Sequence, residues 1–261
     1  MDKITAKTTQ EPQLLKKGFQ NMNKTKECEI HGAYLKYKKS YTGGVIEQRV
    51  CPKCHEEKLE KKKKEDQAME IAGKISRYYE LSNLPKRFKG ITMDGIDLRD
   101  PEIKEAVGFL KKFLAKFPER LEQGSSGFFC GDCGTGKTML ACIMVEDVIK
   151  QGYPAHYTTT WQMIQRIRQG YKTGETNYYI KDYISKALLV IDEIGVQHGT
   201  NDERVLLYQV IDGRYNEVKP TVLISNSKNP VEDGFLDLRT IDRLKDGNGF
   251  SITFNGDSFR K

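Results

Sequence analysis

Eight consecutive residues near the middle of the chain, from Gly131 to Thr138, combine glycines with a lysine and a threonine. One glycine, four residues and then Gly-Lys-Thr is the pattern of a phosphate-binding loop, whose glycines let backbone N–H groups converge on phosphate oxygens. Lys137 would lie against the outer phosphates of a nucleotide, and the hydroxyl of Thr138 would face Mg²⁺. The predicted nucleotide ligands are Gly131, Asp132, Cys133, Gly134, Thr135, Gly136, Lys137 and Thr138.

The segments on either side of this loop support the same interpretation. An apolar run from Phe128 to Cys130 predicts a buried strand, and helical periodicity follows from Met139 to Lys150. A loop between a strand and a helix presents phosphate to a helix N-terminus, whose dipole favours anions. The alternative is a glycine-rich turn that merely contains a lysine, and the order of elements argues against it.

Two adjacent acids follow a second apolar strand. Residues 187–191 read Ala-Leu-Leu-Val-Ile and lead directly into Asp192 and Glu193. Such a strand places its final carboxylate at the edge of the sheet where ligands of open α/β sheets bind. We therefore expect Asp192 to hold Mg²⁺ and Glu193 to act as general base toward a water molecule. For Glu193, a simple surface carboxylate is the alternative.

A polar residue and two arginines further along the chain are additional candidates. The strand predicted over 221–225 ends in Asn226, which either orients the attacking water or simply forms a turn. Arg239 and Arg243 lie four residues apart and therefore share one helix face. They are either surface salt-bridge partners or arginine fingers that reach a neighbouring subunit's nucleotide.

A second constellation, of sulfur and nitrogen donors, lies in the first third of the chain. Two pairs with two intervening residues suit tetrahedral zinc, and their members are Cys28, His31, Cys51 and Cys54. Residues 33–41 and 45–50 predict two strands joined at Thr42-Gly43-Gly44, the chemistry of a hairpin turn, as in a zinc ribbon. His55 competes with His31 as the fourth ligand, although His31 keeps the spacing. Free thiols in a loop without metal are the alternative.

Composition and charge set limits on the class of protein. The chain has 261 residues, 38% of them hydrophobic, which suffices for one sizeable core and a small accessory module. No apolar run approaches the length of a membrane span, and the N-terminus lacks a signal peptide, so we expect a cytoplasmic protein. Residues 1–83 contain 18 lysines and arginines against 12 acids, and residues 84–261 contain 25 against 24. The basic excess thus belongs to the first third, where it could serve nucleic acid, an acidic protein surface or solubility.

The order of predicted elements indicates the fold class. Strands and helices alternate after the phosphate loop, which predicts an α/β fold with a five-stranded parallel sheet and helices on both faces. The four remaining strands are predicted at 155–159, 187–191, 221–225 and 250–254, and the helices at 160–170, around 178–183, 203–215 and 235–244. A helix beginning at Asp100-Pro101-Glu102 precedes the loop. We divide the chain into a flexible basic arm (1–27), a zinc-binding module (28–58), a charged helical linker (59–83) and a nucleotide-binding domain (84–261).

Several of these motifs together resemble one family. The phosphate loop, Leu189 to Gln197 (Leu-Val-Ile-Asp-Glu-Ile-Gly-Val-Gln), Ser225-Asn226-Ser227, Asp242-Arg243-Leu244 and Phe254 to Arg260 (Phe-Asn-Gly-Asp-Ser-Phe-Arg) are similar to those of the DnaC-type replicative helicase loaders. These loaders are AAA+ ATPases of bacteria and their phages. The resemblance covers residues 84–261, and the Cys/His pairs are similar to the N-terminal zinc modules of some loaders, where that region engages the helicase.

This resemblance implies roles for particular residues. Asn226 becomes the sensor residue, and Arg243 becomes the first candidate for an arginine finger, followed by Arg239 and then Arg214. Few residues follow Phe254, which agrees with loaders that lack a C-terminal helical lid. Single-stranded DNA is gripped in such loaders by the segment that corresponds to Trp161–Lys172, where basic and aromatic residues suit a backbone-and-stacking contact, unless this is an ordinary surface helix. The implied DNA contacts are Arg166, Arg168, Tyr171, Lys172 and, more weakly, Thr200.

The function that follows is that of an ATP-dependent helicase loader with ATP, Mg²⁺ and Zn²⁺ as cofactors. Its expected partners are a hexameric replicative DNA helicase, single-stranded DNA and further copies of the chain, with ATP binding driving assembly and hydrolysis driving release. An IstB-type transposition helper ATPase shares the same core and is one alternative. A zinc-dependent nucleic-acid-binding adaptor, whose nucleotide site acts only as a switch, is the other.

Overall fold

The computed structural model describes residues 19–20, 25–35, 38–41, 44–47, 50–195, 200–256 and 258–259. The chain divides into two compact units, Met1–Glu70 and Ile71–Lys261, and each is described by itself. The division falls within one long helix, α1 (Pro52–Leu81). This helix comprises most of the predicted linker (59–83) and also the last part of the predicted zinc module.

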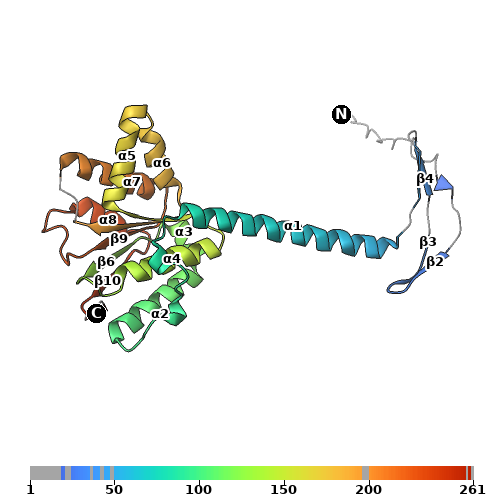
Figure 1. Ribbon diagram of the computed structural model, residues 1–261, viewed down its shortest axis with the longest axis horizontal. Helices are drawn as coiled ribbons and strands as arrows, with labels where there is room; N and C mark the ends of the chain where they lie inside the picture. Colours follow the sequence, from blue (N-terminus) through green and yellow to red (C-terminus); the bar gives the residue numbers. More distant parts are fainter. Residues whose placement is uncertain are drawn as a thin grey trace, which may run out of the picture. The chain divides into compact units, whose positions relative to one another are not determined.

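The first unit contains short antiparallel strands (Figure 1). Strand β2 (Thr25–Cys28) pairs with β3 (Gly32–Leu35), while β4 (Lys38–Tyr41) pairs with β5 (Gly44–Glu47) and with β1 (Phe19–Gln20). The β4–β5 pair confirms the predicted hairpin, whose turn residues 42–43 lie outside the described residues. The prediction of one strand over 33–41 was wrong, because β3 and β4 belong to different sheets. The reason is a turn at residues 29–31, closed by Gly32 at φ 69°, which folds β3 back onto β2.

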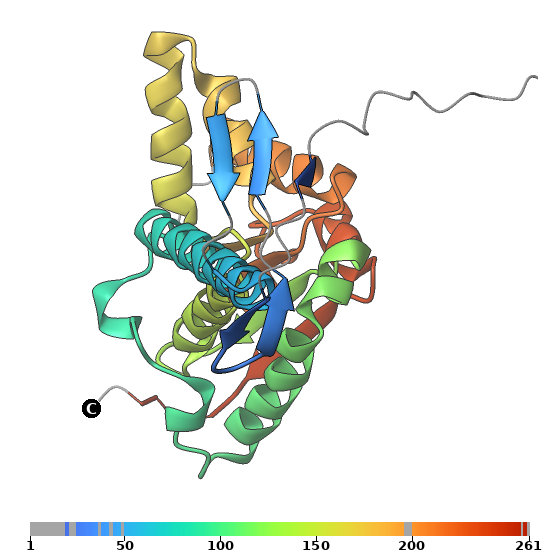
Figure 2. The same ribbon diagram turned by 90° about the vertical axis from the view of Figure 1, so that its right-hand side faces the viewer.

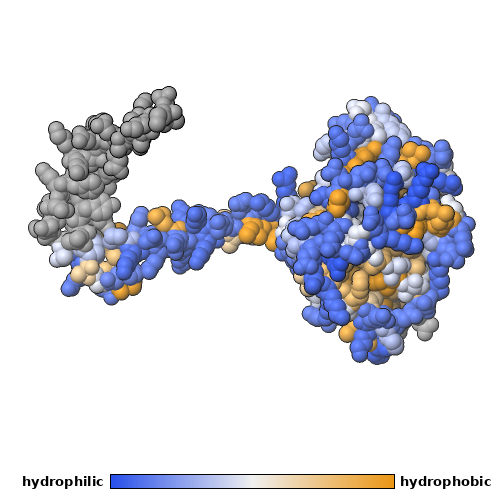
Figure 3. Space-filling model, turned by 180° about the vertical axis from the view of Figure 1, so that it is seen from behind, coloured by the Kyte–Doolittle hydropathy of each residue, from blue (hydrophilic) through white to orange (hydrophobic). Residues whose placement is uncertain are grey.

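Helix α1 is a charged helix with little apolar surface along most of its length. Its lysines and glutamates are good helix formers, and Lys61 and Glu65 form an i,i+4 ion pair at 3.9 Å. Figure 3 shows the helix covered mainly by hydrophilic residues. The exception is its last turns, where Ile75, Tyr78 and Tyr79 pack against the core of the second unit.

The second unit is built on a parallel sheet in the order β10-β6-β9-β8-β7, which confirms the predicted five-stranded α/β fold. The strands are β6 (Gly127–Gly131), β7 (Ala155–Thr159), β8 (Leu188–Ile194), β9 (Thr221–Ser225) and β10 (Phe250–Phe254). Strands β6, β8 and β9 are apolar and buried nearly throughout, as expected where helices cover both faces of a parallel sheet.

Alternate residues of these strands enter two separate cores, one on each face of the sheet. Phe129 and Val190 pack with α2 (Pro101–Ala115) and α4 (Lys137–Lys150). Phe128 and Leu189 pack on the opposite face with α5 (Thr160–Thr173), α6 (Thr176–Ser185) and α7 (Asn201–Asn216). Figures 1 and 2 show this three-layer arrangement of the second unit. The two cores form because successive side chains of a strand point to opposite faces of the sheet.

The remaining helices are η2 (Lys86–Phe88), η3 (Met93–Gly95), α3 (Phe117–Gln123) and α8 (Leu238–Lys245). The predicted cap at Asp100 is confirmed, since its carboxylate accepts a hydrogen bond from the N–H of Glu102 at 2.8 Å. Helix α8 begins at Leu238 rather than at residue 235, because the Asp237 carboxylate caps it by accepting from Thr240 N–H at 2.6 Å. None of the helices in the described part of the chain is long and apolar enough to cross a membrane.

Candidate nucleotide and metal sites

The phosphate loop follows β6 and ends at the first residues of α4. Gly131, Gly134 and Gly136 adopt positive φ angles of 124°, 83° and 92°, a region that side chains other than glycine rarely enter. At Gly131 a Cβ atom would also lie 2.0 Å from the carbonyl oxygen of Phe254 in β10. The loop therefore needs glycine both for its curvature and for its contact with the neighbouring strand.

Lys137 lies inside this loop with only 4% of its surface exposed. Its ammonium group donates to the carbonyl oxygens of Gly131 at 2.7 Å and Asp132 at 2.6 Å. Burial lowers the pKa of Lys137 from its ordinary value, and the nearby Cys133 and Asp192 oppose that effect. The loop thus holds a cation beside backbone N–H groups at a helix N-terminus, an arrangement suited to phosphate.

Asp192 meets the loop from the end of β8, as the sequence predicts. One carboxylate oxygen, Oδ2, accepts from the Thr138 hydroxyl at 2.7 Å and from the Tyr157 hydroxyl at 2.9 Å. The other, Oδ1, accepts from Glu193 N–H at 2.6 Å. The threonine hydroxyl and the carboxylate predicted to bind Mg²⁺ are therefore in contact, and both are hard oxygen donors that fit this cation.

Glu193 lines the same cavity as Asp192, although adjacent residues of a strand normally point to opposite faces. The backbone explains this: the pairing of β8 with β9 shifts between Ile191 and Ile194, and Glu193 adopts φ 60°. This irregularity turns the second carboxylate toward the cavity. Burial and the adjacent Asp192 raise the pKa of Glu193 above its ordinary value, which suits a general base.

The cavity has a volume of about 510 Å³, within the range of small-molecule sites. Its lining includes the phosphate loop, Asp192, Glu193 and Asn226. It also includes apolar residues that the sequence did not assign to the site, together with Arg87 and Asp97; the apolar residues are Phe88, Ile91, Ile96, Ile103, Met139 and Phe259. Apolar side chains next to a phosphate loop can hold a nucleotide base.

The position of Asn226 in the loop after β9 is compatible with both predicted roles, a turn residue and a residue that orients water. Asn226 lines the cavity, while Ser227 N–H donates to the Ser225 hydroxyl in a local turn at 3.1 Å. Lys228 forms an ion pair with Asp132 of the phosphate loop at 3.2 Å. Asn226 is therefore part of a turn and also faces the candidate nucleotide site.

The first two candidate arginine fingers differ in their surroundings. Arg243 pairs with Asp212 at 2.6 Å, lies over the rings of Tyr208 and Tyr215, and does not line the cavity of its own subunit. Arg239 is exposed, and no salt bridge to it is found among the described residues.

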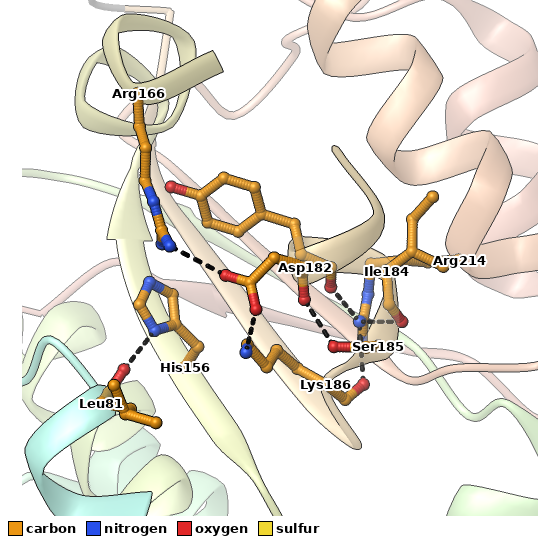
Figure 4. Close-up of polar contacts among 9 residues, drawn as sticks. Leu81, His156, Arg166, Asp182, Ile184, Ser185, Lys186 and Arg214 are labelled. Atoms are coloured by element: carbon orange, nitrogen blue, oxygen red, sulfur yellow. Dashed lines mark hydrogen bonds and ion pairs between the residues drawn. The ribbon is translucent and has the colours of Figure 1, made fainter. Parts of the chain in front are cut away.

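Arg214, the third candidate, is a correction to the sequence prediction. It is fully buried and donates to the Thr221 hydroxyl and to four carbonyl oxygens, those of Tyr183, Ile184, Lys186 and Pro220. Figure 4 shows it directed at the carbonyl groups around the end of α6. A side chain committed to five acceptors in the core cannot reach another subunit, so its role is structural.

The predicted DNA-contacting residues of α5 mostly have partners within the second unit. Arg166 pairs with Asp182 of α6 at 3.0 Å (Figure 4), and Arg168 pairs with Asp202 of α7 at 2.9 Å. The Tyr171 hydroxyl donates to the same Asp202 at 2.9 Å. Thr200 caps α7 by accepting from Glu203 N–H, whereas Lys172 is exposed.

The four predicted zinc ligands come together in the first unit. Their ligand atoms, from Cys28, His31, Cys51 and Cys54, all lie within 4.8 Å of one another. His31 Nδ1 is 3.3 Å from Cys54 Sγ, 3.8 Å from Cys51 Sγ and 3.9 Å from Cys28 Sγ. Tetrahedral zinc with Zn–S bonds of about 2.3 Å places ligand atoms about 3.3–3.8 Å apart, close to the 3.3–3.9 Å found from His31 Nδ1, so the donor set fits zinc after small side-chain shifts. His55 does not belong to this cluster, and all the cysteines in it are free thiols.

The electrostatics and hydrogen bonding of the cluster are also those of a metal site. Backbone N–H groups of Ile30 and His31 lower the pKa of Cys28 to about 6, and the hydrogen bond from Cys54 to Cys28 raises the pKa of Cys54 to about 11. Neighbouring thiolates repel each other, and a cation between them would remove that penalty. The second nitrogen of His31, Nε2, contacts the Glu57 carboxylate at 2.9 Å, as an outer partner of a zinc-bound histidine does.

A parallel five-stranded sheet, a phosphate loop after β6 and an acid pair at the end of β8 define an ATP-binding protein of the AAA+ class. Residues 120–261 match the family described as IstB-like ATP binding protein, which is more than half of the chain. The chain belongs to this family.

The chain is also similar to several replication proteins. It is 26% identical over 191 residues to the replicative helicase loader DnaC of Escherichia coli (strain K12), covering 72% of this chain and 77% of that protein. The crystal structure of the DnaC helicase loader matches with a TM-score of 0.58 and 20% identity over 66% of this chain and all of that one. The replication initiator DnaA bound to AMPPCP and single-stranded DNA matches with a TM-score of 0.57 and 20% identity, covering 67% and 52%. The predicted DnaC-type resemblance is confirmed as homology.

Proposed function

We propose that this protein is an ATPase that loads a hexameric replicative helicase onto single-stranded DNA. The observation that carries the proposal is the combination of homology to DnaC over 191 residues with an assembled nucleotide site in the same part of the chain. ATP binding would drive side-by-side assembly of the AAA+ domains, and hydrolysis would drive release of the loader. The solved relative that holds AMPPCP and single-stranded DNA shares this fold and supports both ligands.

The positions of the side chains in the cavity support the proposed hydrolytic roles. Lys137 binds the outer phosphates, Glu193 removes a proton from the attacking water, and Asn226 orients that water. Thr138 and Asp192 would hold Mg²⁺, which supplies positive charge to neutralise the phosphates during transfer. Arg243 of one subunit, or Arg239, would act on the nucleotide of the next. Arg243 is paired with Asp212. To reach the nucleotide of a neighbouring subunit, Arg243 must either break this ion pair or approach that nucleotide together with Asp212.

We assign helicase binding to the first unit and binding of single-stranded DNA to the α5 segment. The Cys/His cluster would hold Zn²⁺ and so fix the β2–β3 turn and the start of α1 as a binding surface, with the basic arm beside it in the sequence. Contact with single-stranded DNA is proposed for Arg166, Arg168, Tyr171, Lys172 and Thr200. Of these, Lys172 is exposed, whereas the two arginines would exchange carboxylate partners for DNA phosphates.

Glu193→Gln tests the catalytic assignment because it removes the base and keeps the size of the side chain. We expect ATP turnover, measured with and without single-stranded DNA, to fall by about 10²- to 10⁴-fold while ATP binding persists. Glu105→Gln on the exposed face of α2 is the matched control and should turn over ATP like the wild type. Equal turnover in both variants would show that Glu193 is not the base.

A transposition helper ATPase is the second candidate, because the matched family is IstB-like. The two functions differ in the partner of the first unit. We expect the full chain to capture a purified hexameric replicative helicase, and Cys51→Ser or a zinc chelator to abolish capture. An intact, zinc-loaded chain that hydrolyses ATP but binds no replicative hexamer would favour the transposition helper.

A further inference from the structure

Tyr157 is a buried residue of the edge strand β7 that reaches the metal-binding carboxylate. Only 6% of its surface is exposed. The β7–β8 register pairs Tyr157 with Val190, two residues before Asp192, so its side chain must extend toward the carboxyl end of β8. There its hydroxyl donates to Asp192 Oδ2 at 2.9 Å, the same oxygen that accepts from Thr138 at 2.7 Å. No sequence motif pointed to this tyrosine.

The hydroxyl of Tyr157 completes a set of contacts that fixes Asp192 in one orientation. Glu193 N–H holds the opposite carboxylate oxygen at 2.6 Å, and the Thr160 hydroxyl donates to the Asp192 carbonyl oxygen at 3.0 Å. Of the two donors to Oδ2, Thr138 is itself a predicted Mg²⁺ ligand. Tyr157 is therefore the donor that can keep hold of the carboxylate when Thr138 turns to the cation. Burial and the Asp192 charge raise the pKa of Tyr157, so it stays a neutral donor.

The backbone of Tyr157 is held from the other side by the residues that follow α1. Its N–H donates to the Ser82 carbonyl oxygen at 2.9 Å, and its carbonyl oxygen accepts from the Asn83 side-chain amide at 3.1 Å. The adjacent His156 contacts the Leu81 carbonyl oxygen through Nδ1 at 2.7 Å (Figure 4). Residues 81–83 thus occupy the open edge of β7 and restrict how far Tyr157 can move.

We propose that Tyr157 is a positioning residue for the Mg²⁺-holding carboxylate and acts through Asp192. The inference rests on the proposed ATPase function. Partners that hydrogen-bond a metal ligand set its orientation, and their loss weakens metal affinity or activity by about 10- to 100-fold. The defect expected at Tyr157 is therefore a higher requirement for Mg²⁺.

Tyr157→Phe in the full chain removes the hydroxyl and keeps the ring. We expect the Mg²⁺ concentration for half-maximal ATP turnover to rise by about 10-fold or more. ATP affinity in excess EDTA should stay within about twofold of wild type, because neither Lys137 nor the loop loses a contact. Tyr153→Phe, a partly buried tyrosine just before β7 that packs on Phe117, is the matched control and should leave both quantities unchanged.

The two readouts separate a positioning role from damage to the fold. A variant that has lost its fold would lose ATP affinity in EDTA as well as its response to Mg²⁺, and a wild-type Mg²⁺ curve for Tyr157→Phe would overturn the inference. In a chain that carries Asp192→Ala, adding Tyr157→Phe should have no further effect on the Mg²⁺ requirement, since the hydroxyl acts only through that carboxylate. If the wild-type chain does not hydrolyse ATP at any Mg²⁺ concentration, the proposed function itself fails, and this role falls with it.

Discussion

The Cys/His cluster and the nucleotide site bring distant residues together by different physical means. Around the cluster, Cys51 at 5% exposure is the single buried apolar residue among the side chains described in the first unit. The nucleotide site lies instead at one edge of a sheet whose two faces are both filled by apolar cores. A site held by four donor atoms depends on its ligand for stability, whereas a site on a packed sheet is formed before its ligand arrives.

Removing the proposed zinc is the strongest test of this contrast. Chelation or Cys51→Ser should release the zinc and unfold the first unit, because structural zinc contributes about 10–16 kcal/mol to such small modules. Hydrogen exchange should show lost protection in β2, β3 and the start of α1. The thermal unfolding and ATP affinity of the second unit should not change.

Cys142→Ser is the matched control for that experiment. Cys142 is 1% exposed in α4, so a hydroxyl there should destabilise the second unit by about 1–3 kcal/mol and leave the zinc content intact. A fall in stability of the second unit upon chelation would contradict the separation of the two units.

We expect acid to destabilise the second unit through His156. Burial lowers the pKa of His156 to about 4, with Lys186 and Arg166 acting in the same direction and the Leu81 carbonyl and Asp182 opposing them. The unfolded chain therefore binds a proton near pH 6.5 that the folded unit excludes until about pH 4. Stability contributed by neutral His156 is complete above pH 6.5 and is lost as the pH falls to 4, by up to about 3 kcal/mol.

His156→Gln should flatten this part of the pH dependence, measured by denaturant unfolding of the second unit. His55→Gln, at an exposed position outside the Cys/His cluster, should retain the wild-type slope. A slope between pH 6.5 and 4 that survives in His156→Gln would assign the acid sensitivity to other groups.

The smallest expected effect concerns Glu57, the outer partner of the proposed zinc site. Glu57→Gln weakens the contact with His31 Nε2 without changing a ligand, so zinc affinity should fall by about 10-fold. Competition with a coloured chelator measures this. Glu60→Gln, exposed on the same helix, should bind zinc like the wild type. Equal affinities in the two variants would leave Glu57 as an ordinary surface carboxylate.

Local patterns predicted much of the fold and both clusters of ligands. The phosphate loop, the Asp192 strand and the Cys/His pairs each place their chemistry within a few residues, so spacing alone indicates the geometry. The split of residues 33–41 into two strands did not follow from spacing, because it depends on which partner each strand pairs with.

Residues that act through long-range packing could not be predicted in this way. The apolar part of the cavity lining combines Phe88 with Phe259, which are distant in sequence, and the motif around Phe259 does not indicate that its ring lines the cavity. Arg214 resembles any surface arginine in the sequence, and only the carbonyl groups around the end of α6 show that it is enclosed. In the sequence Tyr157 is one residue of a short predicted strand. Its contact with Asp192 can be inferred only when the β7–β8 register is known.

The backbone at Glu193 has a consequence for protein engineering. Its φ of 60° is a conformation that glycine or asparagine adopts readily and that costs a longer side chain about 1 kcal/mol. A library selected only for resistance to heat would therefore enrich glycine or asparagine at this position and discard the proposed base. Thermostability and the proposed ATP turnover would then favour different amino acids here, and a heat-selected variant that still binds ATP would hold it unhydrolysed.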